Sequence, residues 1–156
     1  MLYFAYGSNM NCDQMRQRCP SARFFCIAKL KDHRLVFPRT SNKRRCGVAS
    51  IGASKGCEVW GVVFQIDELE REKLDSYEGY NPGSEPKENS YLRRKIQVAP
   101  DGDETRPLSV FTYVANPQPG EHKPSRDYKK TILDGARFWN LPAHYIRKLE
   151  AISVSG

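Results

Sequence analysis

A short stretch near the N-terminus, Gly7-Ser8-Asn9, has the residue types needed to hold an anionic group. The preceding segment, Leu2–Tyr6, is apolar and aromatic, which predicts a buried strand. Gly7 tolerates a positive φ, and Ser8 and Asn9 can bend the chain by binding their own backbone. A helix capped near Asn11 would leave successive backbone N–H groups facing one concavity, which suits a carboxylate or a developing oxyanion. The same pattern also fits an ordinary turn after a buried strand.

Glu78 is the carboxyl group best placed for general acid–base chemistry. It is expected at the C-terminal end of a helix, because Gly79 follows it and glycine is typical just beyond a helix end. The negative end of the helix dipole disfavours ionisation there, and the neighbouring Tyr77 and Tyr80 can exclude water. Both effects raise the pKa of a carboxyl group, as a general acid or base requires. An exposed glutamate at a helix end is the alternative interpretation.

Tyr128 falls in the first turn of a helix that the sequence predicts from Pro124-Ser125 to about Trp139. From this position its hydroxyl can point at a ligand. Alternatively, its ring packs in the core and its oxygen lies at the surface. Both interpretations remain open from the residues alone.

Metal-binding patterns are lacking in the sequence. The histidines His33, His122 and His144 are scattered, without the spacing of metal ligands. The chain has 5 cysteines and no C-x-x-C motif, so they are expected to be reduced thiols. We therefore expect no metal.

Short strands joined by hairpins, together with a few helices, must position these residues. Besides the first strand, strands are expected at 24–30, 33–37, 47–51, 59–66, 91–98 and 108–114. A basic loop is expected at Pro38–Arg45 and a turn at Lys55-Gly56. Asp67 is expected to cap a helix that turns Leu69 and Leu74 inward, and a last helix follows Pro142. This pattern predicts an α+β fold with a largely antiparallel, barrel-like sheet.

The composition is that of an ordinary globular chain. With 156 residues, 39% of them hydrophobic, it is expected to form a single domain over 1–156. It has no apolar run of the ~20 residues that a membrane helix needs, and no signal-peptide pattern, so a cytoplasmic location is expected. The net charge of +7 includes two basic clusters, Arg39–Arg45 and Arg93-Arg94-Lys95. Such clusters can hold anionic ligands or nucleic acid, but we interpret them as solvated and expect no nucleic-acid partner.

Four short motifs, in order along the chain, resemble those of the γ-glutamylcyclotransferase family. They are Tyr3–Asn9, Glu58–Val63, Leu74-Asp75 with Glu78-Gly79, and Pro124-Ser125 with Tyr128-Lys129-Lys130, followed by Gly135-Ala136 and Leu141-Pro142. The resemblance covers most of the chain. It implies a small closed mixed barrel with flanking helices and a pocket at the Tyr-Gly-Ser-Asn turn, without metal or cofactor.

The resemblance also implies a reaction. The family releases 5-oxoproline from γ-glutamyl compounds, because the α-amino group of the substrate attacks its own γ-carbonyl and expels an amine. By resemblance, Glu78 takes the proton of the attacking amine and returns one to the leaving nitrogen. The backbone around Gly7, Ser8 and Asn9 would hold the small-molecule substrate, and Tyr128 would orient it. Tyr3 and Tyr6 would wall the pocket.

One segment departs from the family pattern. The stretch Tyr80–Asn89 looks longer than expected and carries Glu85 and Glu88. We expect this acidic loop to face the leaving amine and to favour a cationic one, as in a γ-glutamyl-protected antibiotic intermediate. A solvated loop without a role is the alternative.

Other function classes also remain open at this stage. A small-ligand-binding or nucleic-acid-binding module on the same fold, without the chemistry, fits the sequence as well. We expect a monomer or a homodimer.

Overall fold

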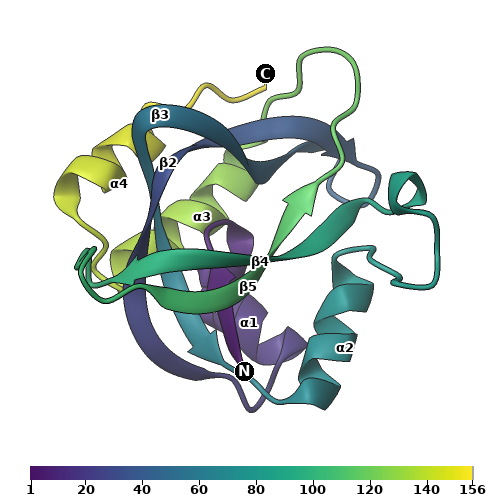
Figure 1. Cartoon of the computed structure of the whole chain (residues 1–156). Coiled ribbons are helices and arrows are strands. Elements are labelled where there is room, and N and C mark those ends of the chain that lie inside the picture. Colours follow the sequence, from purple (N-terminus) through teal and green to yellow (C-terminus); the bar gives the residue numbers. More distant parts are fainter. Residues whose placement is uncertain (156) are drawn as a thin grey trace.

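The computed structural model describes residues 1–155, which form a closed barrel with helices around it (Figure 1). The strands follow one another around the barrel in the order β1-β3-β2-β4-β5. Their bounds are β1 (Leu2–Ala5), β2 (Arg23–Ser41), β3 (Cys46–Gln65), β4 (Tyr91–Pro100) and β5 (Leu108–Ala115). Neighbouring strands pair antiparallel, except that β1 lies parallel to β5 where Tyr3 meets Phe111. The predicted closed, largely antiparallel mixed barrel is confirmed.

Two long strands form most of the barrel, where the sequence predicted four short ones. β2 and β3 pair along nearly their whole lengths, from Arg23 with Gln65 to Ser41 with Cys46. The predicted turn at Lys55-Gly56 is wrong. Gly56 has a positive φ of 82° but lies within β3, at a shift in the pairing with β2. A β-bulge uses the same residue types as a turn, which is why sequence patterns confuse them.

The predicted basic loop is also shorter than expected. β2 continues through Pro38 to Ser41, so only residues 42–45 lie between β2 and β3. This hairpin end carries Lys43 and Arg44, and β2 itself carries Arg39.

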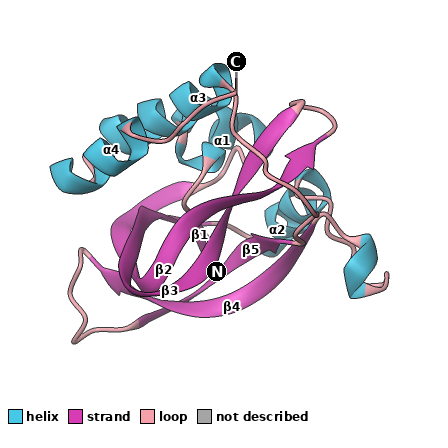
Figure 2. Ribbon diagram, turned by 90° about the horizontal axis from the view of Figure 1, so that it is seen from above, coloured by secondary structure: helices cyan, strands magenta, loops and turns pink. Residues whose placement is uncertain are grey.

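The helices begin at the predicted capping residues. Their bounds are η1 (Ser8–Met10), α1 (Cys12–Arg18), α2 (Glu68–Tyr77), η2 (Pro86–Glu88), α3 (Arg126–Phe138) and α4 (Ala143–Glu150). The side chains of Asn11, Asp67 and Ser125 each accept a backbone N–H in the first turn of α1, α2 and α3. Figure 2 shows α3 and α4 side by side along one side of the barrel. Within residues 1–155, no helix has both the length and the apolar character needed to cross a membrane.

The core lies inside the barrel and under the helices. Phe4, Val62 and Leu74 are fully buried there. Leu69, predicted to face inward, is 72% exposed, so this prediction is wrong. Glu70 takes the inward position instead, because its carboxylate accepts hydrogen bonds from the backbone and hydroxyl of Ser21.

Candidate active site

All the residues proposed from the sequence as site residues line one small cavity of about 40 Å³. β1 and the turn after it supply five of them, the end of α2 supplies one, and the first turn of α3 supplies one. They are Tyr3, Tyr6, Gly7, Ser8, Asn9, Glu78 and Tyr128. Ala49 of β3, Tyr91 of β4 and Tyr113 of β5 complete the wall. The closed barrel therefore brings together groups that lie far apart in the sequence.

The turn after β1 is tight because of close packing. Gly7 has a φ of −116°, so the turn does not use the positive φ that glycine permits. A Cβ atom at Gly7 would lie 3.3 Å from the Cβ of Ala49 and 3.9 Å from the hydroxyl oxygen of Tyr128. The next residues, Ser8–Met10, form the 3₁₀ helix η1, in which the N–H of Met10 donates to the carbonyl of Gly7. The N–H groups of Ser8 and Asn9 begin this helix and thus have no acceptor within it.

Asn9 links the turn to the catalytic carboxyl candidate. Its Nδ2 donates to the hydroxyl of Tyr3 at 3.0 Å and to Oε1 of Glu78 at 3.3 Å. Its Oδ1 accepts from Nε2 of Gln14 at 2.9 Å and from Nη1 of Arg18 at 3.0 Å. Both ends of the amide thus have partners, which fixes its orientation with the donor toward Glu78.

Glu78 lies where the helix pattern predicted it, directly after α2 and before Gly79, whose φ is 66°. Its side chain is only 16% exposed, and burial raises its pKa above the ordinary value. Arg18, with Nη1 3.6 Å from Oε1 of Glu78, acts in the opposite direction, as do Arg44 and Asn9. The net effect is a raised pKa, as predicted from the sequence.

The side chains that bury Glu78 differ from those expected. Tyr77 is 51% exposed, and neither it nor Tyr80 lines the small cavity. The tyrosines of the cavity wall come instead from β1, β4, β5 and α3. The expectation that Tyr77 and Tyr80 enclose the carboxyl group is therefore wrong for the small cavity, although Tyr77 lines a larger neighbouring cavity together with Glu78.

Tyr128 is buried, and its hydroxyl faces the cavity. The oxygen accepts the backbone N–H of Ala49 at 3.0 Å, and burial raises the pKa of Tyr128 to about 12. At neutral pH the hydroxyl thus keeps its proton, which can be donated to a bound ligand. Tyr6 differs, because its hydroxyl donates to the backbone carbonyl of Tyr113. Tyr6 therefore contributes its ring to the cavity wall.

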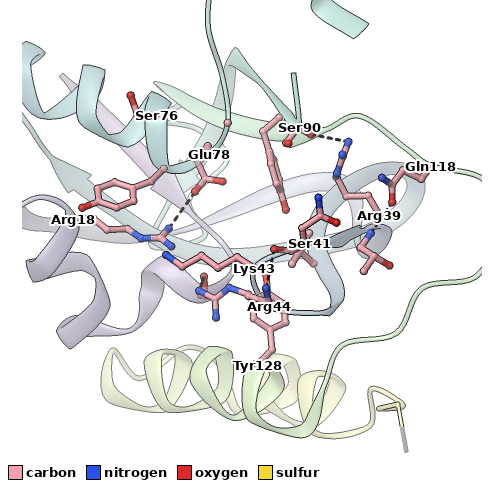
Figure 3. A pocket seen from close by; sticks show the side chains of 17 residues that line it. Arg18, Arg39, Ser41, Lys43, Arg44, Ser76, Glu78, Ser90, Gln118 and Tyr128 are labelled. Carbon is pink, nitrogen blue, oxygen red and sulfur yellow. Dashed lines mark hydrogen bonds and ion pairs between the residues drawn. The ribbon is translucent and has the colours of Figure 1, made fainter. Parts of the chain in front are cut away.

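A second cavity of about 280 Å³ shares Ser8, Glu78, Tyr91 and Tyr128 with the first. Figure 3 shows its basic side chains. They are Arg18, Arg39, Lys43 and Arg44. We term this larger cavity the basic pocket.

Sequence reasoning missed these cations as site residues. The solvated-loop interpretation is wrong for Arg39, which lies in β2, and for Arg44, because both are partly buried and line the basic pocket. Lys43 is exposed in the loop, as expected, but it also lines this pocket. The sequence signal that could have identified them is the cluster of positive charges between two predicted strands. Arg18 had no such signal, because it is one of several charged residues on a short helix.

The acidic loop lies elsewhere. Glu85 and Glu88 are exposed in and beside η2, and neither lines the small cavity or the basic pocket. Asn89 anchors the loop, because its Oδ1 accepts the N–H of Asn81 at 2.8 Å and its carbonyl accepts Nδ2 of Asn116 at 2.7 Å. The expectation that Glu85 and Glu88 face the leaving amine is therefore wrong.

Metal binding has no candidate in the part of the chain that the structure describes. Among residues 1–155, no three histidine, cysteine, aspartate or glutamate side chains are grouped as metal ligands. The groups that the small cavity presents are a buried carboxyl group, an N–H-rich turn and tyrosine hydroxyls.

Comparison with known proteins places the chain in a family. The model of the AIG2-like family matches residues 58–149. The human protein named gamma-glutamylcyclotransferase is 39% identical over 158 residues, covering 97% of this chain and 78% of the human one. The chain belongs to the AIG2-like family. The mouse gamma-glutamylcyclotransferase is 37% identical to this family member over the same shares.

Solved structures agree with this assignment to the AIG2-like family. A structure titled gamma-glutamyl cyclotransferase superposes with a TM-score of 0.87 at 36% identity, covering 99% of this chain and 89% of that chain. A structure whose title describes an uncharacterised human protein superposes with a TM-score of 0.86 at 37% identity, covering 99% of this chain and 88% of that chain. The resemblance drawn from the four sequence motifs is confirmed.

Proposed function

We propose that residues 1–156, as a single domain, act as a γ-glutamylcyclotransferase. The reaction releases 5-oxoproline and a free amine from a γ-glutamyl compound. One observation carries the proposal: a buried carboxyl group with a raised pKa, Glu78, shares a cavity with the turn Gly7-Ser8-Asn9. The human and mouse relatives that bear this name support the same activity.

The proposed reaction needs no enzyme nucleophile. The substrate α-ammonium group first loses a proton to the ionised Glu78 carboxylate. The freed nitrogen then attacks the γ-carbonyl carbon, which forms the ring C–N bond and moves the carbonyl electron pair onto the oxygen. When the carbonyl re-forms, the bond to the leaving nitrogen breaks, and Glu78 returns the proton to that nitrogen. The ring nitrogen also gives up its second proton, which passes to the expelled amine, so 5-oxoproline keeps one N–H and the amine leaves as an ammonium ion. Because both reacting groups belong to one molecule, most of the gain comes from holding the substrate folded for attack.

Each remaining site residue has a role in this proposal. The N–H groups of Gly7, Ser8 and Asn9 bind the substrate and stabilise the developing oxyanion. The hydroxyl of Tyr128 donates to the γ-glutamyl group and orients it. The rings of Tyr3 and Tyr6 form part of the wall that shapes the cavity.

The activity is tested by 5-oxoproline release from γ-glutamyl-alanine, with the wild type beside Glu78→Gln. Glu85→Gln is the matched control, because it removes the same charge from an exposed position outside both cavities. We expect release by the wild type and the control, and a rate lower by about 10²–10⁴-fold for Glu78→Gln. A wild-type rate in Glu78→Gln would remove this residue from its role. No release by the wild type from any γ-glutamyl dipeptide or amine would overturn the activity.

We also propose, from the sequence, a cytoplasmic location and a monomeric or homodimeric state. Light scattering of the purified chain during size exclusion measures the second point directly. A mass above that of two chains of 17.9 kDa would contradict it.

A further inference from the structure

The basic pocket contains positive charges that no carboxylate neutralises. Of its four cations, Arg18 pairs with Glu78, with 3.6 Å between the guanidinium and the carboxylate. Arg39, Lys43 and Arg44 form no ion pair with any carboxylate of residues 1–155. Three full positive charges therefore face this cavity beside the proposed reaction centre.

Neutral groups hold two of these cations in place. Nη1 of Arg39 donates to the backbone carbonyl of Asn116 at 2.9 Å. Nη2 of Arg44 donates to Oε1 of Gln14 at 2.8 Å, and the guanidinium lies 4.8 Å from the centre of the Tyr128 ring. These contacts orient the guanidinium groups without cancelling their charge, so each is ready to bind an anion.

The three cations occupy different parts of the pocket. Arg44 lies beside the small cavity, because its Nη2 is 3.4 Å from the hydroxyl oxygen of Ser8. Figure 3 shows Arg39 on the far side of the view from Glu78, near Gln118, and Lys43 beside Arg44. Both Arg39 and Lys43 line the basic pocket and not the small cavity. Arg44 is thus placed to meet the γ-glutamyl part of a substrate. Arg39 and Lys43 are placed to meet what the reaction expels.

The number of unpaired cations in the basic pocket can be compared with the number of carboxylates on a candidate substrate. A γ-glutamyl dipeptide with a neutral second residue carries two carboxylates, one on the γ-glutamyl part and one on the leaving amino acid. These would pair with two of the three free cations and leave the third without a partner. A leaving amino acid with a carboxylate side chain supplies the third. Much of the remaining wall is polar, with hydroxyls from Thr40, Ser41, Ser76 and Ser90, beside Val48 and the ring of Tyr77.

We infer that the basic pocket is the leaving-group subsite for an acidic amino acid, with Arg39 and Lys43 binding its two carboxylates. This inference rests on the proposed function and names the substrate class for it: γ-glutamyl dipeptides that end in glutamate or aspartate. It reverses the expectation of a cationic leaving group, which depended on the acidic loop.

The test compares γ-glutamyl-glutamate with γ-glutamyl-glutamine, which have nearly the same shape and differ by one negative charge. The wild type is expected to favour γ-glutamyl-glutamate by about tenfold or more in kcat/KM, since a fixed complementary charge discriminates at this level. The preference is expected to shrink as the salt concentration rises, because the pocket is open to solvent ions.

Variants assign the preference to its residues. Lys43→Gln and Arg39→Gln are each expected to bring the ratio of the two kcat/KM values toward one, and Lys43→Glu is expected to invert it. Lys43 is exposed, so its variants keep the test usable if loss of the Arg39 contact to Asn116 impairs folding. Lys55→Gln is the matched control, an exposed lysine outside the pocket, and is expected to leave the ratio unchanged.

The outcomes separate this inference from the proposed function. Equal wild-type turnover of both dipeptides, or a preference that survives in Lys43→Gln and Arg39→Gln, overturns the inference. In either case release of 5-oxoproline leaves the proposed function intact. Absence of release from both dipeptides, and from γ-glutamyl-alanine, overturns the function itself.

Discussion

The side-chain amide of Asn9 lies 3.3 Å from the carboxylate of Glu78, although 69 positions separate the two residues in the sequence. The same amide also binds Tyr3, Gln14 and Arg18. The turn after β1, the helix α1 and the end of α2 are therefore joined by hydrogen bonds around one carboxyl group. Substitution of any of these partners is expected to change the proton affinity of Glu78.

Arg18 is expected to set the acid limb of the pH–rate profile. Burial raises the pKa of Glu78, and the Arg18 guanidinium partly offsets that rise. If the ionised carboxylate is the base, activity falls as the pH drops through this pKa. Arg18→Gln removes the offset, so the pKa rises further and the limb moves to higher pH. Rates of 5-oxoproline release across the acidic range, for the wild type and Arg18→Gln, measure the shift.

Arg16→Gln provides the control for this shift. Arg16 is exposed on the same helix and lines neither cavity. Its removal is expected to leave the acid limb in place. A limb that stays fixed in Arg18→Gln, or moves to lower pH, would show that Arg18 does not act on the base.

Glu78 is expected to lower the stability of the folded chain at neutral pH. Its pKa is raised on folding, so the folded state binds the proton more tightly than the unfolded state does. Stability is thus lost as the pH rises above the ordinary value of 4.5 and through the folded pKa. Glu78→Gln, which removes the charge, is expected to melt at a higher temperature than the wild type at pH 7. In a chain of this size, each kcal/mol added to the free energy of unfolding raises the melting temperature by about 2–4 °C.

Thermal melts at several pH values measure this effect. The advantage of Glu78→Gln is expected to fade as the pH falls toward and below 4.5, where both forms are neutral. A variant that is less stable than the wild type at pH 7 would contradict the argument. It would mean that the contacts of the carboxylate with Asn9 and Arg18 outweigh the cost of its burial.

Local sequence signals predicted the helices of this fold correctly, but they predicted two short strands in place of each of the long strands β2 and β3. Asn11, Asp67 and Ser125 marked helix starts correctly, because capping depends on residues a few positions away. β2 and β3 were each divided in two, because a residue with positive φ inside a strand has the same sequence signature as a turn. Asp32 and Gly56 are such residues, with φ of 58° and 82°. Only pairing across the barrel distinguishes the two cases.

The candidate site could be predicted in part. Gly7-Ser8-Asn9 and Glu78 carry their signals in neighbouring residues, and the family resemblance gave them roles. Tyr91 and Arg44 reach the site only because the barrel closes and brings distant segments to one cavity. In the sequence, a tyrosine that opens a strand looks like core, and an arginine in a polar hairpin looks solvated.

The hydroxyl of Tyr128 is expected to support the fold as well as the substrate. It is the acceptor for the buried N–H of Ala49, at 3.0 Å. Tyr128→Phe leaves that N–H without this partner, which costs about 1–3 kcal/mol. Unfolding in urea measures the loss, and 5-oxoproline release measures the effect on activity. Tyr80→Phe is the control, since Tyr80 lines neither the small cavity nor the basic pocket, and the variant is expected to lose neither stability nor activity. Equal stability of Tyr128→Phe and the wild type would contradict the structural role.

Two glycines are expected to tolerate alanine to different extents. At Gly7 the added Cβ lies 3.3 Å from the Cβ of Ala49, beside the small cavity, so the neighbour must give by a few tenths of an ångström. At Gly61 it lies 2.3 Å from the backbone oxygen of Ala5 and 2.9 Å from the ring of Phe4, where β1 pairs with β3.

Gly7→Ala is therefore expected to cost about 1 kcal/mol of stability while its methyl group narrows the substrate cavity and raises KM. Gly61→Ala is expected to lose about 3 kcal/mol or more, because the backbone of β1 must move away. Urea unfolding and KM for γ-glutamyl-alanine, measured on both variants, separate the two effects. A stable Gly61→Ala, or a Gly7→Ala with unchanged KM, would mean that these glycines are not required for close packing at β1 and at the cavity.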